Sequence, residues 1–377
     1  MRRRDLISLT SRSVAAIPLV QRVAAAEALK KATVGIREQI PAAMKEMVVP
    51  GVAVALIKDG KVRWRGAFGI ADVLSRRPIM HDTIFQAGSM SKPVFAYAVM
   101  KLAERGVLSL DTPLTKYTRK RLIIGDPQLE LITARHVLSH STGLPNWRSS
   151  ASPLRVNFTP GQKYGYSGEG YYYLQTVVTE LTGREDRAVC RGGYEQDLEV
   201  CATDISTYLR KTVLTPFRME SSCYLASEKP GKPFAHGHDL KGQPVARGKG
   251  HPADAARYAS AGGLLTTASD YARFLLEVID PRPADDSRLS PASIAEMLRP
   301  HTPVETTNDY KAEWALGWRV VTTRGGFFIG HGGDNPGSHC LSEVCPARKS
   351  GFVIMTNGDG GVELIKSVVP AIQAAVY

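Results

Sequence analysis

The sequence has no uninterrupted run of about 18 apolar residues, the length that a membrane-spanning helix needs. Only five of its 377 residues are cysteine, too few for a fold that disulfides hold together. It also lacks a Walker A loop and the Gly-x-Ser-x-Gly turn of α/β-hydrolases. These absences exclude an integral membrane segment, a disulfide scaffold and two common kinds of catalytic site.

The charge is unbalanced, with 48 Lys and Arg against 36 Asp and Glu and a formal net charge of +12. The first 31 residues alone hold seven Lys or Arg against Asp5 and Glu27. Elsewhere the basic runs are short, as at 119–121, and lack the interleaved aromatic residues that stack on bases. We therefore expect no nucleic-acid partner.

The N-terminus has arginines at 2–4, followed by a mildly apolar stretch over 6–23 and three alanines. This order is similar to a twin-arginine export signal, although polar residues interrupt the apolar stretch. Residues 1–28 are therefore either a leader of a periplasmic or secreted protein or an extension of a cytoplasmic one. Cys190 and Cys201 lie in one segment where a local disulfide is feasible, and whether they pair is open.

Hydrophobic periodicity and turn residues predict regular elements at both ends of the chain. Asp59-Gly60 between two apolar runs is a strong hairpin signal. The predicted elements are a helix over 29–47, strands over 52–57 and 62–68, a helix over 93–106, helix-like segments between 110 and 250, strands over 316–322, 326–330 and 351–355, and a helix over 362–375.

Strands at both ends and helices in the middle predict an α+β fold. We expect one antiparallel sheet built from both chain ends and flanked by helices, plus a helical lobe. The expected domain spans 29–375, with a sheet lobe over 29–90 and 256–375 and a helical lobe over 91–255. A substrate cleft is expected where the lobes meet.

Ser89 and Lys92 form a Ser-x-x-Lys pair at the start of the helix predicted over 93–106. At this spacing both side chains lie on one helical face, within reach of each other. Serine is a weak nucleophile that needs an adjacent base, and lysine can serve when burial lowers its pKa. Alone the pair is weak evidence, since the pattern also occurs by chance.

Two later segments strengthen this interpretation. Tyr166 lies in a Tyr-Ser-Gly sequence that follows a Pro- and Gly-rich loop. Residues 328–337 predict a strand that runs into a His-Gly-Gly turn at 331–333. Small residues there would let the backbone approach a substrate closely.

In this combination the motifs resemble the serine β-lactamase and penicillin-recognising hydrolase superfamily. The likeness is greatest to its branch of class C β-lactamases, D-Ala-D-Ala peptidases and family VIII carboxylesterases, and it covers roughly residues 30–375. The supporting segments, in the family's order, are Val49-Pro50-Gly51, Asp111-Thr112-Pro113-Leu114, 132–145 with its stretch 138–145, 260–264 and 355–358.

The resemblance implies roles for three side chains. Ser89 matches the nucleophile that is acylated, and Lys92 matches the lysine that assists its deprotonation. Tyr166 matches the tyrosine that acts as, or shares, the general base. A phenol that normally titrates near pH 10 can be a base only if Lys92 stabilises its anion.

His331, Gly332 and Gly333 match the family's third motif. The backbone N–H groups of Ser89 and Asp334 match the donors of the oxyanion hole. For His331 three roles stay open: orienting a substrate carboxylate, tuning the catalytic tyrosine, or a purely structural one.

The tyrosine motif departs from many relatives at its third residue, where they have Asn and this chain has Gly168. A substrate acylamino group left unpaired by the missing amide would cost about 1–3 kcal/mol. This favours ester hydrolysis over cleavage of β-lactams or peptides. Gly168, Tyr171 and Asn335 are the candidates for lining the cleft, although Tyr171 also fits the start of a core helix.

We expect neither a metal nor an organic cofactor. His136 and His140 have the spacing of a metal pair, but Val137 stands where a zinc protease needs Glu. We interpret these histidines as packing or loop-fixing residues.

The sequence therefore predicts a serine hydrolase that works through an acyl-enzyme on a small-molecule ester or amide, with a carboxylesterase favoured. A β-lactamase or a D-amino-acid peptidase or amidase is an alternative, and a non-catalytic penicillin-binding-like sensor is another. The oligomeric state is open.

Overall fold

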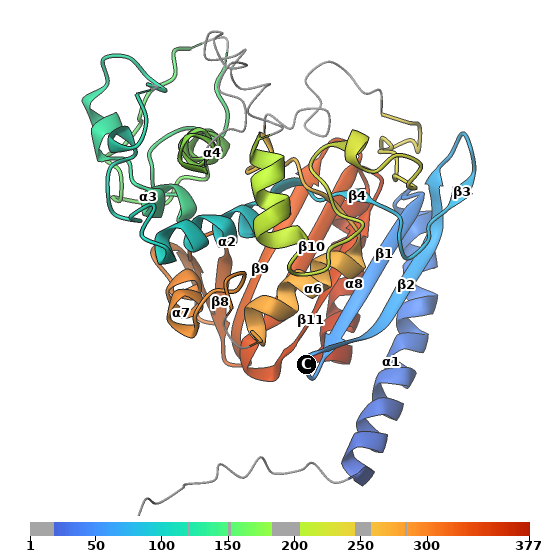
Figure 1. Cartoon of the computed structure of the whole chain (residues 1–377). Coiled ribbons are helices and arrows are strands. Elements are labelled where there is room, and N and C mark those ends of the chain that lie inside the picture. The colour runs from blue at the N-terminus through green and yellow to red at the C-terminus, as the bar shows by residue number, and fades with distance from the viewer. Residues whose placement is uncertain (1–18, 120, 150–151, 183–203, 246–257, 283–284) are drawn as a thin grey trace, which may run out of the picture.

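A nine-stranded antiparallel sheet with the order β3-β2-β1-β11-β10-β9-β8-β7-β6 runs through the protein (Figure 1). The computed structural model describes residues 19–119, 121–149, 152–182, 204–245, 258–282 and 285–377. The strands of the large sheet are β1 (Gly51–Lys58), β2 (Lys61–Asp72), β3 (Arg77–Pro78), β6 (Thr302–Thr306), β7 (Tyr310–Trp314), β8 (Arg319–Thr323), β9 (Gly326–Asn335), β10 (Ser338–Cys345) and β11 (Ser350–Thr356).

Helices cover both faces of this sheet, and a two-stranded sheet of β4 (Phe85–Gln86) and β5 (Leu265–Thr266) lies apart from it. A 3₁₀ turn, η1 (Gly88–Met90), directly precedes α2. The helices are α1 (Leu19–Glu46), α2 (Ser91–Glu104), α3 (Ala134–Leu138), α4 (Gly168–Thr182), α6 (Ala268–Ile279), α7 (Pro291–Leu298) and α8 (Gly361–Val376).

The two chain ends meet inside the sheet, because β1 pairs antiparallel with β11. This confirms the predicted α+β fold with a sheet built from both ends. The hairpin between β1 and β2 is also confirmed, and Asp59 and Gly60 have φ of 52° and 70°. Positive φ at both turn residues is the backbone that suits a tight hairpin.

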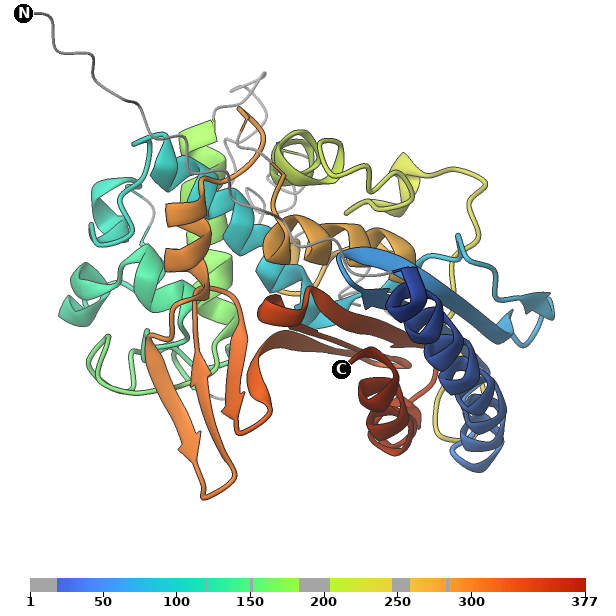
Figure 2. The same cartoon turned by 90° about the horizontal axis from the view of Figure 1, so that it is seen from below.

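Strands β1 and β11, in the interior of the sheet, are buried on both faces. Helices α1 and α8 pack together on one face, and α6 crosses the other (Figure 2). Alternate residues of β1 serve the two cores: Val52 and Val54 join α1 and α8, whereas Ala53 and Ala55 face the core that continues into α2 and α4. Because alternate strand residues point to opposite faces, β1 reads as one continuous apolar run.

The strands near the C-terminus differ from the prediction in their bounds. The expected turn at residues 331–333 is wrong: β9 continues through it to Asn335. Strand β8 begins at Arg319 rather than Leu316, because Gly317 has φ of +86° and breaks the extended conformation. A Cβ on Gly317 would meet Ala96 at 2.4 Å, so this turn packs tightly on α2.

Other elements escaped prediction. Strands β6, β7 and β10 were missed, and the buried face of β10 includes Ser338 and Ser342, which hides its alternation of apolar and polar residues. Helix α1 begins earlier than expected, at Leu19. Between residues 110 and 167, among the described residues, α3 is the one α-helix, so that stretch is less helical than predicted.

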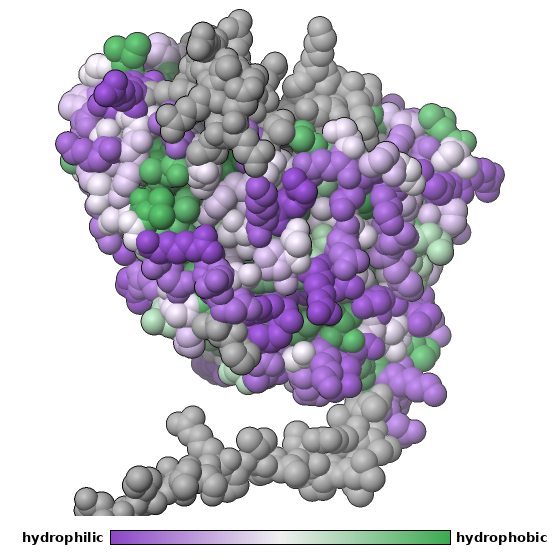
Figure 3. Space-filling view, viewed as in Figure 1, coloured by the Kyte–Doolittle hydropathy of each residue, from purple (hydrophilic) through white to green (hydrophobic). Residues whose placement is uncertain are grey.

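Hydrophilic side chains cover most of the face in Figure 3, with hydrophobic ones in small groups. None of the helices in the described part of the chain is long and apolar enough to cross a membrane. Residues 1–18 of the predicted leader, Cys190 and Cys201 lie outside the described residues.

Candidate active site

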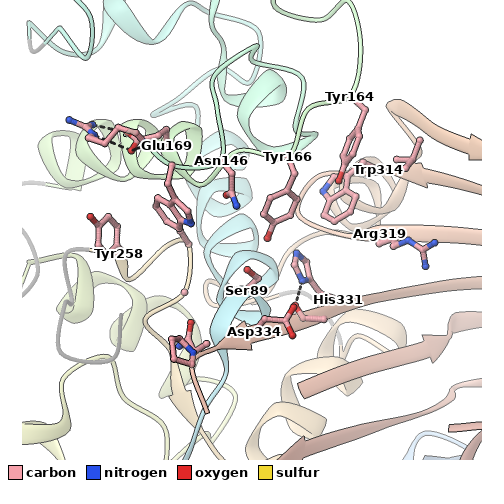
Figure 4. A pocket seen from close by; sticks show the side chains of 18 residues that line it. Ser89, Asn146, Tyr164, Tyr166, Glu169, Tyr258, Trp314, Arg319, His331 and Asp334 are labelled. Carbon is pink, nitrogen blue, oxygen red and sulfur yellow. Dashed lines mark hydrogen bonds and ion pairs between the residues drawn. The ribbon is translucent and has the colours of Figure 1, made fainter. Parts of the chain in front are cut away.

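A cavity of about 680 Å³ opens where η1, the segment before α4 and strand β9 come together (Figure 4). Ser89 lies on its floor, Tyr166 on one wall and His331 on another. The cavity thus brings together residues from three parts of the chain that lie far apart in the sequence.

Ser89 is held in η1, immediately before the buried helix α2. The Ser91 hydroxyl donates to Gly88 O at 2.7 Å and accepts from Leu264 N–H at 2.9 Å, which fixes the turn against residues 258–264. Gly88 has φ of +50°, and a Cβ there would lie 2.7 Å from Asp334 N. Only glycine allows the nucleophile's turn and β9 to approach this closely.

Lys92 lies beneath the nucleophile and is 1% exposed. Its Nζ donates to Ser89 Oγ at 3.0 Å and to Ala261 O at 2.7 Å. Burial lowers the pKa of Lys92 to about 7, because the charged ammonium loses its hydration. A large fraction of the amine is therefore neutral near pH 7 and can accept the serine proton.

Tyr166 borders the cavity beside Ser89, and Lys92 Nζ lies 4.8 Å from the centroid of its ring. Burial raises the pKa of the Tyr166 phenol above its ordinary value, and a hydrogen bond with Ser89 acts in the opposite direction. Of the two predicted base candidates, these shifts favour the lysine as proton acceptor and leave the tyrosine protonated.

His140 positions Tyr166. The two rings stack with their centroids 4.1 Å apart, and His140 Nδ1 accepts from Ser167 N–H at 3.0 Å. Burial, with smaller effects of Lys92 and His331, holds the pKa of His140 well below its ordinary value, so the imidazole is neutral. The packing role predicted for His140 is therefore present, and its partner is a predicted catalytic side chain.

His331 is also buried and neutral. Burial and the nearby Lys92 lower its pKa to about 3, and its Nδ1 lies 2.5 Å from Gly332 O. With Nδ1–H donating to this carbonyl, Nε2 is an acceptor, and it has no hydrogen-bond partner among the described residues. A neutral acceptor is unsuited to holding a substrate carboxylate, so this geometry argues against the first of the three roles considered for His331.

Strand β9 presents a backbone edge beside Ser89. Its pairing with β8 ends at Gly330, while its pairing with β10 continues to Asn335. A Cβ on Gly333 would lie 2.0 Å from Ala87 O, so a larger residue would push the strand off the nucleophile's turn. The Asp334 carboxylate points away to His339 at 2.7 Å, which leaves its main chain beside Ser89.

The structure brings most of the predicted site residues together. Lys92 contacts Ser89 beneath the cavity, and Gly333 lies in β9 where that strand packs on Ala87. The predicted residues that border the cavity are Ser89, Tyr166, His331, Gly332, Asp334 and Asn335.

Two of the predicted cleft residues do not line the cavity. Tyr171 is fully buried in α4 and its hydroxyl donates to Leu138 O at 3.3 Å, because the first turn of that helix packs into the core. Gly168 lies behind Trp147, whose ring atoms are 2.5 Å from where a Cβ would stand. Tyr171 is therefore a core residue, and Gly168 provides space for the tryptophan.

Sequence reasoning missed the outer wall of the cavity, which consists of Trp147, Arg148, Glu169 and Tyr258. The Trp147 and Tyr258 rings pack edge to face with centroids 5.0 Å apart. Arg148 binds Glu169 through two side-chain contacts of 3.0 and 2.7 Å. These residues follow no motif, and the available sequence signal was a Trp-Arg pair soon after the 138–145 segment.

Two further residues of the cavity were also missed. Asn146 lies between Tyr166 and Glu169 in Figure 4, on the wall that faces Ser89. Arg319, at the start of β8, lies on the other side of Tyr166 beside Trp314. An amide is therefore present in the cavity even though position 168 of the tyrosine motif lacks one.

The described residues contain no group of three or more His, Cys, Asp or Glu side chains arranged to hold a metal ion. His136 holds the loop before α3, because its Nδ1 accepts from Thr133 N–H at 3.3 Å in a capping box.

The sequence profile of the Beta-lactamase family matches residues 36–376. The chain belongs to this family of serine hydrolases, as the motifs predicted. Among its relatives, Esterase EstB of Burkholderia gladioli is 36% identical over 106 residues, which cover 28% of this chain and 27% of that protein. This alignment therefore spans about a quarter of the esterase.

Two other relatives align over most of the chain. Penicillin-binding protein 4 of Amycolatopsis lactamdurans is 25% identical over 345 residues, covering 85% of this chain and 84% of that protein. The octameric penicillin-binding protein homologue from Pyrococcus abyssi superposes with a TM-score of 0.71 at 24% identity, covering 90% of this chain and 76% of that one. The last similarity establishes the shared fold.

Proposed function

We propose that this protein is a carboxylesterase that hydrolyses small esters through an acyl-enzyme on Ser89. The observation that carries the proposal is the Lys92 Nζ atom, 3.0 Å from Ser89 Oγ and buried so that its pKa is about 7. A serine beside a desolvated amine is an activated nucleophile.

In the proposed reaction, neutral Lys92 takes the Ser89 proton as the hydroxyl attacks the ester carbonyl. The carbonyl oxygen accepts hydrogen bonds from the backbone N–H groups of Ser89 and Asp334 as it becomes negative. Tyr166 then donates its proton to the leaving alcohol and regains one from the protonated Lys92. Water releases the acid by the reverse proton path, so the enzyme returns to its starting state.

The preference for esters over amides rests on the proton donor. Burial raises the pKa of the Tyr166 phenol above its usual value, so the phenol is a weak acid. An amine leaves only if it is protonated as the C–N bond breaks, and a weak acid does this poorly. Alcohol and phenol leaving groups depend on it less. The similarity to Esterase EstB supports the same substrate class.

The test is hydrolysis of 4-nitrophenyl acetate and butyrate by wild type, Ser89→Ala and the exposed control Ser367→Ala on α8. We expect Ser89→Ala to lose turnover by at least about 10³-fold, with unchanged thermal unfolding, while Ser367→Ala keeps it. Mass spectrometry after a fluorophosphonate should find one adduct, on Ser89.

Three outcomes would contradict the proposal. Hydrolysis by Ser89→Ala at the wild-type rate would show that Ser89 is not the nucleophile. A stable Ser89 adduct without ester turnover would indicate a sensor. Faster turnover of a chromogenic cephalosporin or a D-Ala-D-Ala peptide than of any ester would assign the site to a β-lactamase or a peptidase.

A further inference from the structure

Asp334 brings a negatively charged side chain to the place where the proposed reaction also develops negative charge. Its backbone N–H is the proposed second donor to the oxyanion, and its side chain is 72% exposed and borders the cavity. Because like charges repel, a carboxylate turned toward Ser89 would oppose formation of the oxyanion. The direction in which this side chain points therefore matters for the reaction.

The backbone around Asp334 leaves its side chain room to turn. Strand β9 pairs with β8 only as far as Gly330, so Asp334 lies on an edge of the strand. Its charge already acts on the site: burial is the main cause of the raised pKa of Tyr166, and the Asp334 carboxylate adds to it. A rotation of the carboxylate into the cavity would strengthen this effect.

His339 draws the carboxylate to the other side of the strand. It stands directly opposite Asp334 in the pairing of β9 with β10, and its Nδ1 lies 2.7 Å from Asp334 Oδ1. The histidine lies beside the start of α8, where a Cβ on Gly361 would be 3.1 Å from the His339 Cβ. Since α8 covers the face of the sheet opposite the core that contains α2, this contact holds the carboxylate away from Ser89.

A second carboxylate fixes the orientation of the His339 ring. Its Nε2 lies 3.6 Å from Asp359 Oδ1, which also accepts from Gly337 N–H at 2.6 Å. Burial disfavours a charged imidazole, but the two carboxylates outweigh it and raise the pKa of His339. Because a nitrogen lone pair would be repelled by a carboxylate oxygen at 2.7 Å, Nδ1 carries a proton whether the ring is neutral or charged.

We propose that His339 is a positioning residue of the esterase, whose Nδ1–H donates to the Asp334 carboxylate and keeps that charge turned away from the oxyanion hole. The Asp334 N–H then stabilises the oxyanion without an opposing charge from its own side chain. This inference rests on the proposed function and deepens it. Acylation and deacylation both form an oxyanion, so the effect falls on kcat rather than KM, whichever step limits turnover.

The experiment measures kcat and KM for 4-nitrophenyl butyrate in variants of His339. His339→Leu removes the donor, whereas His339→Asn places an amide N–H near the position of Nδ1. We expect His339→Leu to lower kcat about tenfold with KM within about twofold of wild type, and His339→Asn to keep kcat within about threefold. The exposed control His81→Leu should change neither constant.

A double-mutant cycle tests whether His339 acts through Asp334. Asp334→Asn removes the charge of the side chain and keeps the backbone N–H. In this background we expect His339→Leu to change kcat by less than about twofold, since no carboxylate remains to be turned away. Thermal unfolding of each variant is measured alongside, and His339→Ala, which adds no bulk beside Gly361, repeats the cycle if His339→Leu does not fold.

The outcomes distinguish this inference from the proposed function. Ser89-dependent hydrolysis with kcat unchanged in His339→Leu, or with a change confined to KM, would overturn the inference alone. An equal loss of kcat in the wild-type and Asp334→Asn backgrounds would also overturn it, as would a loss that His339→Asn does not recover, because either result marks a packing role. Absence of Ser89-dependent hydrolysis by the wild type would overturn the proposed function and this inference with it.

Discussion

At the inner end of the cavity Lys92 is 1% exposed, whereas Trp147 on the outer wall is 45% exposed. Lys92 belongs to the buried helix α2, and Trp147 belongs to an irregular segment after α3. Burial alters the pKa values of Lys92 and Tyr166 at the inner end. The outer wall instead presents two aromatic rings and the Arg148–Glu169 ion pair to the cavity. The proposed chemistry and the proposed selectivity therefore rest on different elements, a buried helix and an exposed irregular segment.

The largest effect is expected from Lys92→Met, which keeps the length of the side chain and removes the base. We expect kcat/KM for 4-nitrophenyl butyrate to fall about 10³-fold, within the range that a general base contributes. Lys366→Met, on the exposed face of α8, is the matched control and should retain activity. Activity above a tenth of wild type in Lys92→Met would show that another group deprotonates Ser89.

The pH dependence of kcat/KM is expected to show the titration of Lys92. Because burial lowers the pKa of Lys92 to about 7 from its ordinary 10.5, protonation below pH 7 removes the base. We expect kcat/KM to fall about tenfold per unit below pH 7 and to stay flat from pH 8 to 9. A rate that is constant between pH 5 and pH 9 would contradict the assigned base.

The smallest effect is expected on the outer wall. Trp147→Ala removes an exposed ring that packs against Tyr258, so it should weaken binding without touching the proton path. We expect KM for 4-nitrophenyl phenylacetate to rise about fivefold and kcat to stay within about twofold of wild type.

The control is Ile124→Ala, at an apolar residue that is 93% exposed, and it should change neither constant. If Trp147→Ala instead lowered kcat as strongly as Lys92→Met does, the separation between the inner end and the outer wall would be wrong.

Much of the fold followed from local patterns. The Asp59-Gly60 hairpin and the terminal helix were predictable because turn residues and apolar periodicity act over a few neighbouring residues. Strand β10 was not, since Ser338 and Ser342 on its buried face are satisfied by hydrogen bonds to distant backbone carbonyls. Polar residues that find partners only in the folded chain hide a strand's alternation.

The candidate site also contains residues that local sequence predicts and residues that only tertiary packing places. Ser89 and Lys92 are three residues apart, so their contact depends on one helical turn and was foreseeable. The burial of Tyr171 and the place of Asn146 were not, because each depends on how the 138–148 segment packs against α4.

The sequence by itself was enough to predict the family, a sheet completed by both chain ends, and Ser89 and Lys92 as the proposed catalytic pair. The tertiary structure decided which group we propose as the base, since the pKa of Lys92 depends on burial that no local pattern expresses. It also decided which residues form the outer wall, because Trp147 and Tyr258 meet only when segments about a hundred residues apart pack together.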